Sequence, residues 1–199
     1  MSIPRSIYIN RSRNLTHSVG EHDGPPVKVG VAITDLSTGL YTTTSILAAL
    51  LHRHRSDPPQ GQHIDVSLSD VQVASLANIA SSALISPDSN PGRWGTAHPS
   101  IVPYQGFRTR DGMIMIGAGN DRQFGILCEC LGRRELVLEE RFATNEARVR
   151  NRGELLGIIE REMEKRGTGE WLRVFEGKGM PYAAIKYILF CYPSPNSHL

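Results

Sequence analysis

The segment from Val27 to Arg55 constrains the fold more than any other part of the sequence. Residues 27–34 are mostly β-branched and apolar, which predicts a buried strand, and residues 38–54 carry leucines at helical spacing. The predicted helix ends in His-Arg-His-Arg, and cationic side chains suit the negative end of a helix dipole. A strand that leads through a short loop into a helix is typical of α/β folds, so we expect that fold class.

The alternation of predicted strand and helix continues to about residue 86 and then ends. Residues 63–68 predict a short strand, and residues 69–85, rich in alanine and valine, predict a second helix with Ser69 as a possible N-cap. Residues 86–99 hold several prolines and glycines, which interrupt regular structure. We therefore expect a linker here and a domain boundary near residue 90.

The sequence after the linker has a different pattern. Two short stretches, residues 104–109 and 113–118, flank Arg110-Asp111-Gly112, which predicts a hairpin. Helical patterns follow at residues 122–131, 152–166 and 169–176, and residues 180–185 predict a strand edge or a binding loop. This part of the chain therefore predicts a small α/β domain.

Composition excludes several classes of protein. Lys and Arg number 22 against 20 Asp and Glu, and a net charge of +2 argues against nucleic acid or an anionic membrane as the main partner. No apolar run approaches the ~20 residues that span a bilayer. The three cysteines, Cys128, Cys130 and Cys191, have neither metal-ligand spacing nor the pattern of a disulfide framework. We expect reduced thiols and no metal site.

The ends of the sequence bear on localisation. The first 20 residues contain Arg5, Arg11 and Arg13 and no acid, which fits a mitochondrial matrix presequence. The final Ser-His-Leu loosely resembles a peroxisomal signal. We expect a mitochondrial location, with the cytoplasm and the peroxisome as alternatives.

Asp35 lies between the predicted strand and the predicted helix. A carboxylate at this place is close to the helix amide groups, which favour its ionised form and orient it for a reaction. Alternatively, Asp35, Ser37 or Thr38 only caps the helix. Both interpretations remain open from the residues alone.

Two loops are further candidate sites. In Gly117-Ala118-Gly119-Asn120, glycines between a strand and a helix can bring backbone N–H groups to a phosphate or an oxyanion, or they can simply form a tight turn. In residues 92–107, Arg93, Trp94, His98 and Tyr104 lie in a Gly- and Pro-rich loop. That loop can carry a site or connect two domains with its aromatic side chains packed.

Three stretches together resemble the class III CoA-transferases, the CaiB/BaiF type. They are PPVKVGVAITDLSTGLYTTTSILAALLHRH with GQHIDVSLSD, then RWGTAHPSIVPYQGFRTRDGMIMIGAGNDRQFGILCECLG, and finally WLRVFEGKGMPYAAI. They occur in the family's order, and the resemblance covers about Leu15 to Ile185. It implies a Rossmann-like large domain, here present in part, and a small α/β domain.

The resemblance also implies a reaction. Asp35 aligns with the family's nucleophilic aspartate, which forms an acyl–aspartyl anhydride and then an aspartyl-CoA thioester. CoA would pass from an acyl-CoA, such as succinyl-CoA, to a dicarboxylic acid such as glutarate. A CoA thioester enters as substrate, and no resident cofactor is implied.

The remaining site residues are expected from the same resemblance. Gly117, Ala118 and Gly119 take the place of a mobile glycine loop with an oxyanion or lid role, although only two glycines are present. Arg93 or Arg122 would hold the second carboxylate of the acceptor, and His98 is a further candidate for substrate binding. A racemase-like activity is an alternative, but Leu-Ser-Thr-Gly after Asp35 favours a transferase.

The resemblance finally implies an interlocked homodimer in which a long N-terminal half supplies most CoA contacts. We expect this chain to carry the nucleophile and the small domain without the CoA pocket, to be inactive alone, or to be a non-catalytic product. We also expect it to expose the apolar faces of residues 27–66. The predicted divisions are 1–26 (irregular), 27–86 (partial large domain), 87–102 (linker), 103–185 (small domain) and 186–199 (atypical tail).

Overall fold

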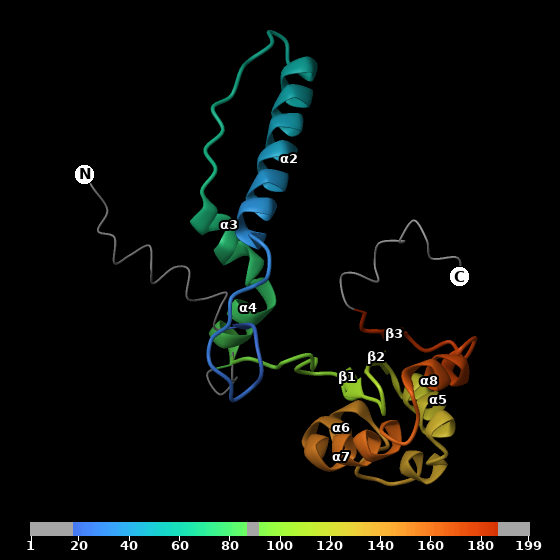
Figure 1. Ribbon diagram of the computed structural model, residues 1–199. Helices are drawn as coiled ribbons and strands as arrows, with labels where there is room; N and C mark the ends of the chain where they lie inside the picture. The colour runs from blue at the N-terminus through green and yellow to red at the C-terminus, as the bar shows by residue number, and fades with distance from the viewer. Residues whose placement is uncertain (1–17, 87–91, 187–199) are drawn as a thin grey trace. The chain divides into compact units, whose positions relative to one another are not determined.

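The computed structural model describes residues 18–86 and 92–186 (Figure 1). The predictions for the presequence, Cys191, the atypical tail and the C-terminal Ser-His-Leu lie outside these residues. The chain divides after Gly95 into two compact units, here called unit 1 (Met1–Gly95) and unit 2 (Thr96–Leu199). This division falls within the predicted linker, and the other predicted domain limits stay predictions.

Three helices make up the regular structure described in unit 1. They are α2 (Ile33–Arg55), α3 (Leu68–Ser75) and α4 (Ala77–Ile85), and α3 packs against α2. The predicted second helix is therefore divided in two. Its N-cap is Ser67, whose Oγ accepts a hydrogen bond from the Asp70 N–H at 3.4 Å, so the prediction of Ser69 as N-cap is wrong.

Both strands predicted in this part of the chain are wrong. Residues 27–32 and 63–67 have no regular structure, and Ile33 and Thr34 already belong to α2. A strand forms only where a neighbouring strand accepts and donates its backbone hydrogen bonds. The described residues of unit 1 offer no such neighbour, so β-branched composition alone does not produce a strand here.

Apolar side chains of unit 1 are largely exposed, as we expected for residues 27–66. Val71 is the one buried apolar side chain among the described residues of this unit, whereas Leu40 in α2 is 71% exposed. Within the described residues no single helix has the length and apolar composition of a membrane span; only α3 and α4 together, bent by 66°, would meet both criteria.

Unit 2 contains a three-stranded antiparallel sheet in the order β1-β2-β3. The strands are β1 (Tyr104–Arg108), β2 (Met113–Gly117) and β3 (Tyr182–Ala184). The predicted hairpin is confirmed, with Phe107 opposite Ile114 in its register. The predicted strand edge is confirmed as β3, which pairs with β2.

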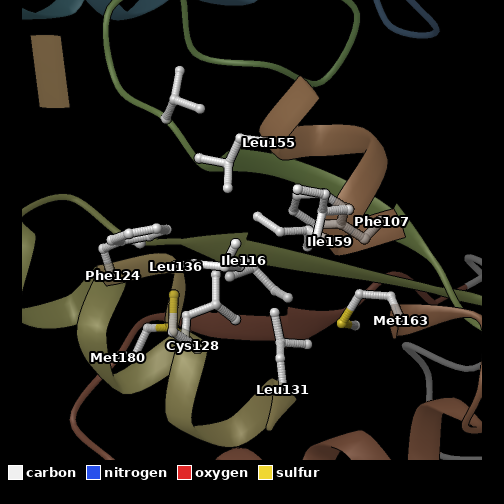
Figure 2. Close-up of a cluster of buried hydrophobic side chains, with 14 of the residues drawn as sticks. Phe107, Ile116, Phe124, Cys128, Leu131, Leu136, Leu155, Ile159, Met163 and Met180 are labelled. Carbon is white, nitrogen blue, oxygen red and sulfur yellow. The ribbon is translucent and has the colours of Figure 1, made fainter. Parts of the chain in front are cut away.

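Helices surround this sheet and close a single core. They are α5 (Asp121–Leu131), the 3-10 helix η1 (Arg134–Val137), α6 (Asn145–Arg150), α7 (Arg152–Met163) and α8 (Thr168–Phe175). Figure 2 shows side chains from β1, β2, α5, η1 and α7 converging, among them Phe107, Ile116, Phe124, Leu136 and Ile159. Together with the sheet, these helices confirm the predicted α/β class.

The helix ends of unit 2 follow from local residues. Asn120 caps α5, because its Oδ1 accepts the Gln123 N–H at 2.9 Å, and Gly132 ends that helix with a φ of 71°, which favours glycine. Trp171 of α8 stacks on Phe175, and its Nε1–H donates to the Met163 carbonyl at 2.7 Å. These contacts fix α8 against the end of α7.

Candidate functional site

Asp35 lies in the first turn of α2, and its side chain is exposed. The first i→i−4 bond of the helix joins the Leu36 N–H to the Ala32 carbonyl at 3.0 Å, so the amides of Thr34 and Asp35 precede it. Such amides have no partner inside the helix, and they lie at the positive end of the helix dipole. The local structure thus presents the Asp35 carboxyl group to solvent at the start of α2.

The capping interpretation of this segment is wrong. Ala32 is the N-cap of α2, and no side chain makes a capping hydrogen bond to it. Ser37 and Thr38 lie inside the helix, where the Thr38 Oγ1 donates to the Thr34 carbonyl at 2.7 Å. Asp35 therefore does not cap α2. Its nucleophilic role stays a prediction.

The Gly117–Gly119 turn connects β2 to α5 in unit 2. The Gly117 N–H donates to the Pro181 carbonyl at 3.0 Å, and the Ala118 N–H donates to the Pro103 carbonyl at 2.9 Å. Both residues are buried. Two of the three amides expected to stabilise an oxyanion are therefore used within the protein in this conformation.

Gly119 differs from its two neighbours. It is exposed, and its N–H donates to the side-chain Oε1 of Gln123 at 2.8 Å rather than to a backbone carbonyl. A side chain can rotate away, whereas the carbonyls of Pro103 and Pro181 are fixed by the chain on either side. The predicted oxyanion role is thus left with the Gly119 amide, and the lid role stays a prediction.

Tyr104 contacts both His98 and this turn. The two rings are stacked with centroids 5.5 Å apart, and the Tyr104 ring lies over Gly117, where an added Cβ would be 3.4 Å from it. His98 Nδ1 accepts the Ser100 N–H at 3.2 Å, so the proton of a neutral ring lies on Nε2. His98 can therefore donate a hydrogen bond from Nε2 beside the turn.

The two candidate arginines differ in their partners. Arg93, in unit 1, donates through Nε to the Glu21 carbonyl at 3.0 Å and through Nη2 to the Gly24 carbonyl. Arg122 is exposed in the first turn of α5, and its side chain makes no hydrogen bond or ion pair with another described residue. The structure therefore favours Arg122 over Arg93 for holding a carboxylate.

Arg148 of α6, which is not among the residues predicted from sequence, has a completely buried side chain. It donates through Nε to the Val102 carbonyl at 2.8 Å, through Nη1 to the Phe142 carbonyl at 2.9 Å and through Nη2 to Asp121 Oδ1 at 2.7 Å. No local pattern marks this residue, because two of its three partners lie more than 20 residues away.

Within residues 18–86 and 92–186, the cysteines and possible metal ligands do not form a second reactive site. Burial raises the pKa of the Cys128 thiol to about 12, which keeps it protonated. Within the described ranges, no three side chains of His, Cys, Asp and Glu are arranged to hold a metal ion. A hollow of about 370 Å³ lies at the far end of α2, lined by Leu50, Arg53, His54 and Pro59. It is roughly 28 Å along the helix from Asp35 at 1.5 Å per residue.

Comparison with known proteins identifies the family. The model of CoA-transferase family III matches residues 8–196, and the chain belongs to this family. This match confirms the family that the three sequence stretches resemble.

The relatives include three enzymes of related name. Human succinyl-CoA:glutarate CoA-transferase is 44% identical over 92% of this chain and 41% of its own length. The mouse protein of that name is 46% identical over 86% of this chain and 38% of its own length. Succinate–glutarate CoA-transferase of Agrobacterium fabrum is 43% identical over 89% of this chain and 44% of its own length. The chain thus spans less than half the length of these relatives.

Solved structures show the same fold. A CaiB/BaiF family protein from Brucella suis superposes with a TM-score of 0.72 at 40% identity, covering 94% of this chain and 49% of that one. A protein from Mycobacterium tuberculosis, in an orthorhombic crystal form, gives a TM-score of 0.78 at 25% identity, with coverage of 94% and 48%.

Proposed function

We propose that this chain contributes the reactive aspartate of a CoA-transferase that moves CoA from succinyl-CoA to a dicarboxylic acid such as glutarate. The observation that carries the proposal is the position of Asp35, exposed in the first turn of α2, in a chain of family III. A solvent-accessible carboxylate at the start of a helix can reach a substrate carbonyl and act as a nucleophile.

The choice of substrates rests on the relatives. The three relatives at 43–46% identity are named for succinyl-CoA or succinate and glutarate. More distant ones are named for oxalate, at 34% identity, and for mesaconate, at 31%. All of these acceptors are dicarboxylic acids, which supports that class, and the higher identities support glutarate within it.

In the proposed reaction, a carboxylate oxygen of Asp35 attacks the thioester carbonyl of succinyl-CoA. The C–S bond breaks, the CoA thiolate leaves, and an acyl–aspartyl anhydride forms. The thiolate then attacks the aspartyl carbonyl, which releases succinate and leaves an aspartyl-CoA thioester. The acceptor repeats these two steps in reverse, so that its carboxylate gains CoA and Asp35 returns to a free carboxylate.

Unit 2 contains groups whose chemistry suits two needs of this reaction. Each attack places negative charge on a carbonyl oxygen, and the Gly119 N–H is the amide of the turn that can be released to stabilise it. Arg122 is the described arginine of the candidate set without a protein acceptor, and its guanidinium suits the distal carboxylate of the acceptor. His98 can donate from Nε2 to a substrate oxygen.

Assembly and location belong to the same proposal. We expect a homodimer and a mitochondrial location, with the cytoplasm or the peroxisome as alternatives. The apolar side chains of α2 are exposed, and such a surface normally packs against other polypeptide. This exposure supports the expectation that the chain is inactive alone.

The test traps the intermediate chemically. The chain is incubated with succinyl-CoA, quenched with hydroxylamine and analysed by peptide mass spectrometry. The same is done with a chimera in which it replaces the matched 41% of the human relative. We expect a hydroxamate on Asp35 at least in the chimera, lost in Asp35→Asn and retained in the control Asp23→Asn.

Either of two results would overturn the proposal. One is the absence of a hydroxamate from both the chain and the chimera. The other is deuterium uptake from solvent next to the thioester carbonyl without trapping, which would support the racemase alternative.

A further inference from the structure

Arg148 is a completely buried arginine that lies outside the proposed reaction. A buried charge is costly unless it is paired and hydrogen-bonded, and here the guanidinium also lies 4.4 Å from the centre of the Phe124 ring. Its three acceptors belong to three separate segments: the residues before β1, the loop before α6 and the first turn of α5. The side chain therefore joins parts of unit 2 that are distant in sequence.

Two of these segments flank the Gly117–Gly119 turn. The carbonyl of Val102 accepts from Arg148, and the carbonyl of the next residue, Pro103, accepts the Ala118 N–H. On the other side of the turn, Asp121 accepts from Arg148 and is the first residue of α5. Arg148 thus restrains both the residue that fixes Ala118 and the helix that follows Gly119.

This arrangement accounts for the difference between the amides of the turn. Because Ala118 is held by a backbone carbonyl and α5 is held at its start, Gly119 has a fixed position and only its acceptor, the Gln123 side chain, can move. A preorganised donor stabilises developing charge better than one that must be ordered during the reaction. A group that restrains the turn would therefore keep the Gly119 N–H in position as a donor.

We propose that Arg148 is a positioning residue that holds the Gly117–Gly119 turn and keeps the Gly119 N–H preorganised as a hydrogen-bond donor to a substrate oxygen. This inference rests on the proposed function. It assigns to Arg148 an effect on one turn, in addition to the general stabilisation that any well-packed buried side chain provides.

The first test measures amide hydrogen exchange in the full chain by NMR. Arg148→Lys should raise the exchange rate of the Ala118 amide about tenfold more than that of the Trp171 amide, since one local restraint is lost. Asp121→Asn, which keeps the arginine, should give a smaller rise at Ala118. The control Arg150→Met, on the same helix, removes an exposed ion pair with Glu146 and should leave both exchange rates nearly unchanged.

The second test uses whichever form, chain or chimera, is trapped at Asp35. Arg148→Lys should lower kcat for CoA transfer with little change in KM, because the restraint serves the transition state. Equal exchange factors at Ala118 and Trp171 in Arg148→Lys would overturn the inference, whatever the transferase assay shows. The other informative result is a larger rise in exchange at Ala118 than at Trp171 in Arg148→Lys, together with no hydroxamate on Asp35. That result would count against the proposed function and would still establish that Arg148 restrains the turn.

Discussion

The two units of the chain use their apolar residues in opposite ways. In unit 2 the sheet and its helices enclose a core, and every buried apolar side chain described in the chain except Val71 belongs to this unit. In unit 1 the longest helix, α2, has no buried residue. Unit 2 therefore contains the groups that stabilise it, whereas unit 1 does not bury enough apolar surface to do so.

The two sides of α2 make the contrast clear. One side, which we call the apolar face, exposes large side chains at helical spacing: Ile33, Leu36, Leu40, Leu47, Leu50 and Leu51. The other side carries the half-buried hydroxyl residues Thr34, Thr38, Thr42 and Ser45. An amphipathic helix normally buries its apolar face against other polypeptide. The described residues of unit 1 leave the apolar face of α2 exposed to solvent.

The largest effect is expected in the core of unit 2. Phe107→Ala removes a side chain that is 1% exposed, so it should lower the free energy of unfolding of unit 2 by about 3–5 kcal/mol. Urea unfolding followed by circular dichroism measures this change. A loss below about 1 kcal/mol would mean that the core of unit 2 is loosely packed, and it would break the comparison.

A somewhat smaller loss is expected at the buried arginine. Arg148→Met leaves the buried carbonyls of Val102 and Phe142 without a donor, which should cost about 2–4 kcal/mol of unit 2 stability. Arg150→Met on the same helix removes an exposed ion pair with Glu146 and should cost less than about 0.5 kcal/mol. Equal effects in urea unfolding would contradict a special role for the buried residue.

Acid should weaken unit 2 through the turn of its hairpin. The backbone N–H of Thr168 donates to Asp111 Oδ1 at 2.7 Å and holds the pKa of that carboxyl below its ordinary value of 3.8. A pKa lowered by folding gives stability that is present above the ordinary pKa and lost as the pH falls through the folded-state pKa. Asp111→Asn should therefore flatten the acid side of the stability curve of unit 2.

Thermal unfolding between pH 6 and pH 2, a range set by the ordinary pKa of Asp, measures this dependence. The control is Asp23→Asn, in unit 1, which should leave the curve of unit 2 unchanged. An unchanged curve in Asp111→Asn would remove Asp111 from the account of acid sensitivity.

The smallest effect is expected on the apolar face of α2. Leu40→Gln replaces a side chain that is 71% exposed, so stability should change by no more than about 0.5 kcal/mol. Solubility, measured as the protein remaining in solution after concentration, should rise because an apolar patch is reduced. A loss of more than about 2 kcal/mol would show that this face is covered in solution, and the contrast between the units would then disappear.

The same contrast explains which elements the sequence could predict. The hairpin and the α5, α7 and α8 helices were predicted to within a few residues, because turn residues, caps and apolar spacing act locally. The strands at residues 27–34 and 63–68 were wrong, because a strand depends on a partner that these residues do not have. Helix α2 begins at Ile33 rather than near Thr38, so Asp35 lies inside the helix instead of before it.

The candidate site divides along the same line. The Gly117–Gly119 turn could be chosen from sequence because it lies between a correctly predicted strand and helix, whereas the strand expected before Asp35 is wrong and only the family resemblance singles that residue out. The use of the turn amides could not, since Pro103 and Pro181 reach them from distant segments. For the same reason, nothing near Arg148 in the sequence predicted that it is buried.

One further feature makes the two units separately observable. The chain has two tryptophans, and Trp94 lies in unit 1 while Trp171 lies in unit 2, 2% exposed and with Arg166 4.9 Å from the centre of its ring. Tryptophan fluorescence, excited selectively over tyrosine, then reports on unit 2 alone in a Trp94→Phe protein and on unit 1 alone in a Trp171→Phe protein. Each unit carries its own optical probe, so the melting of one can be followed without any attached label.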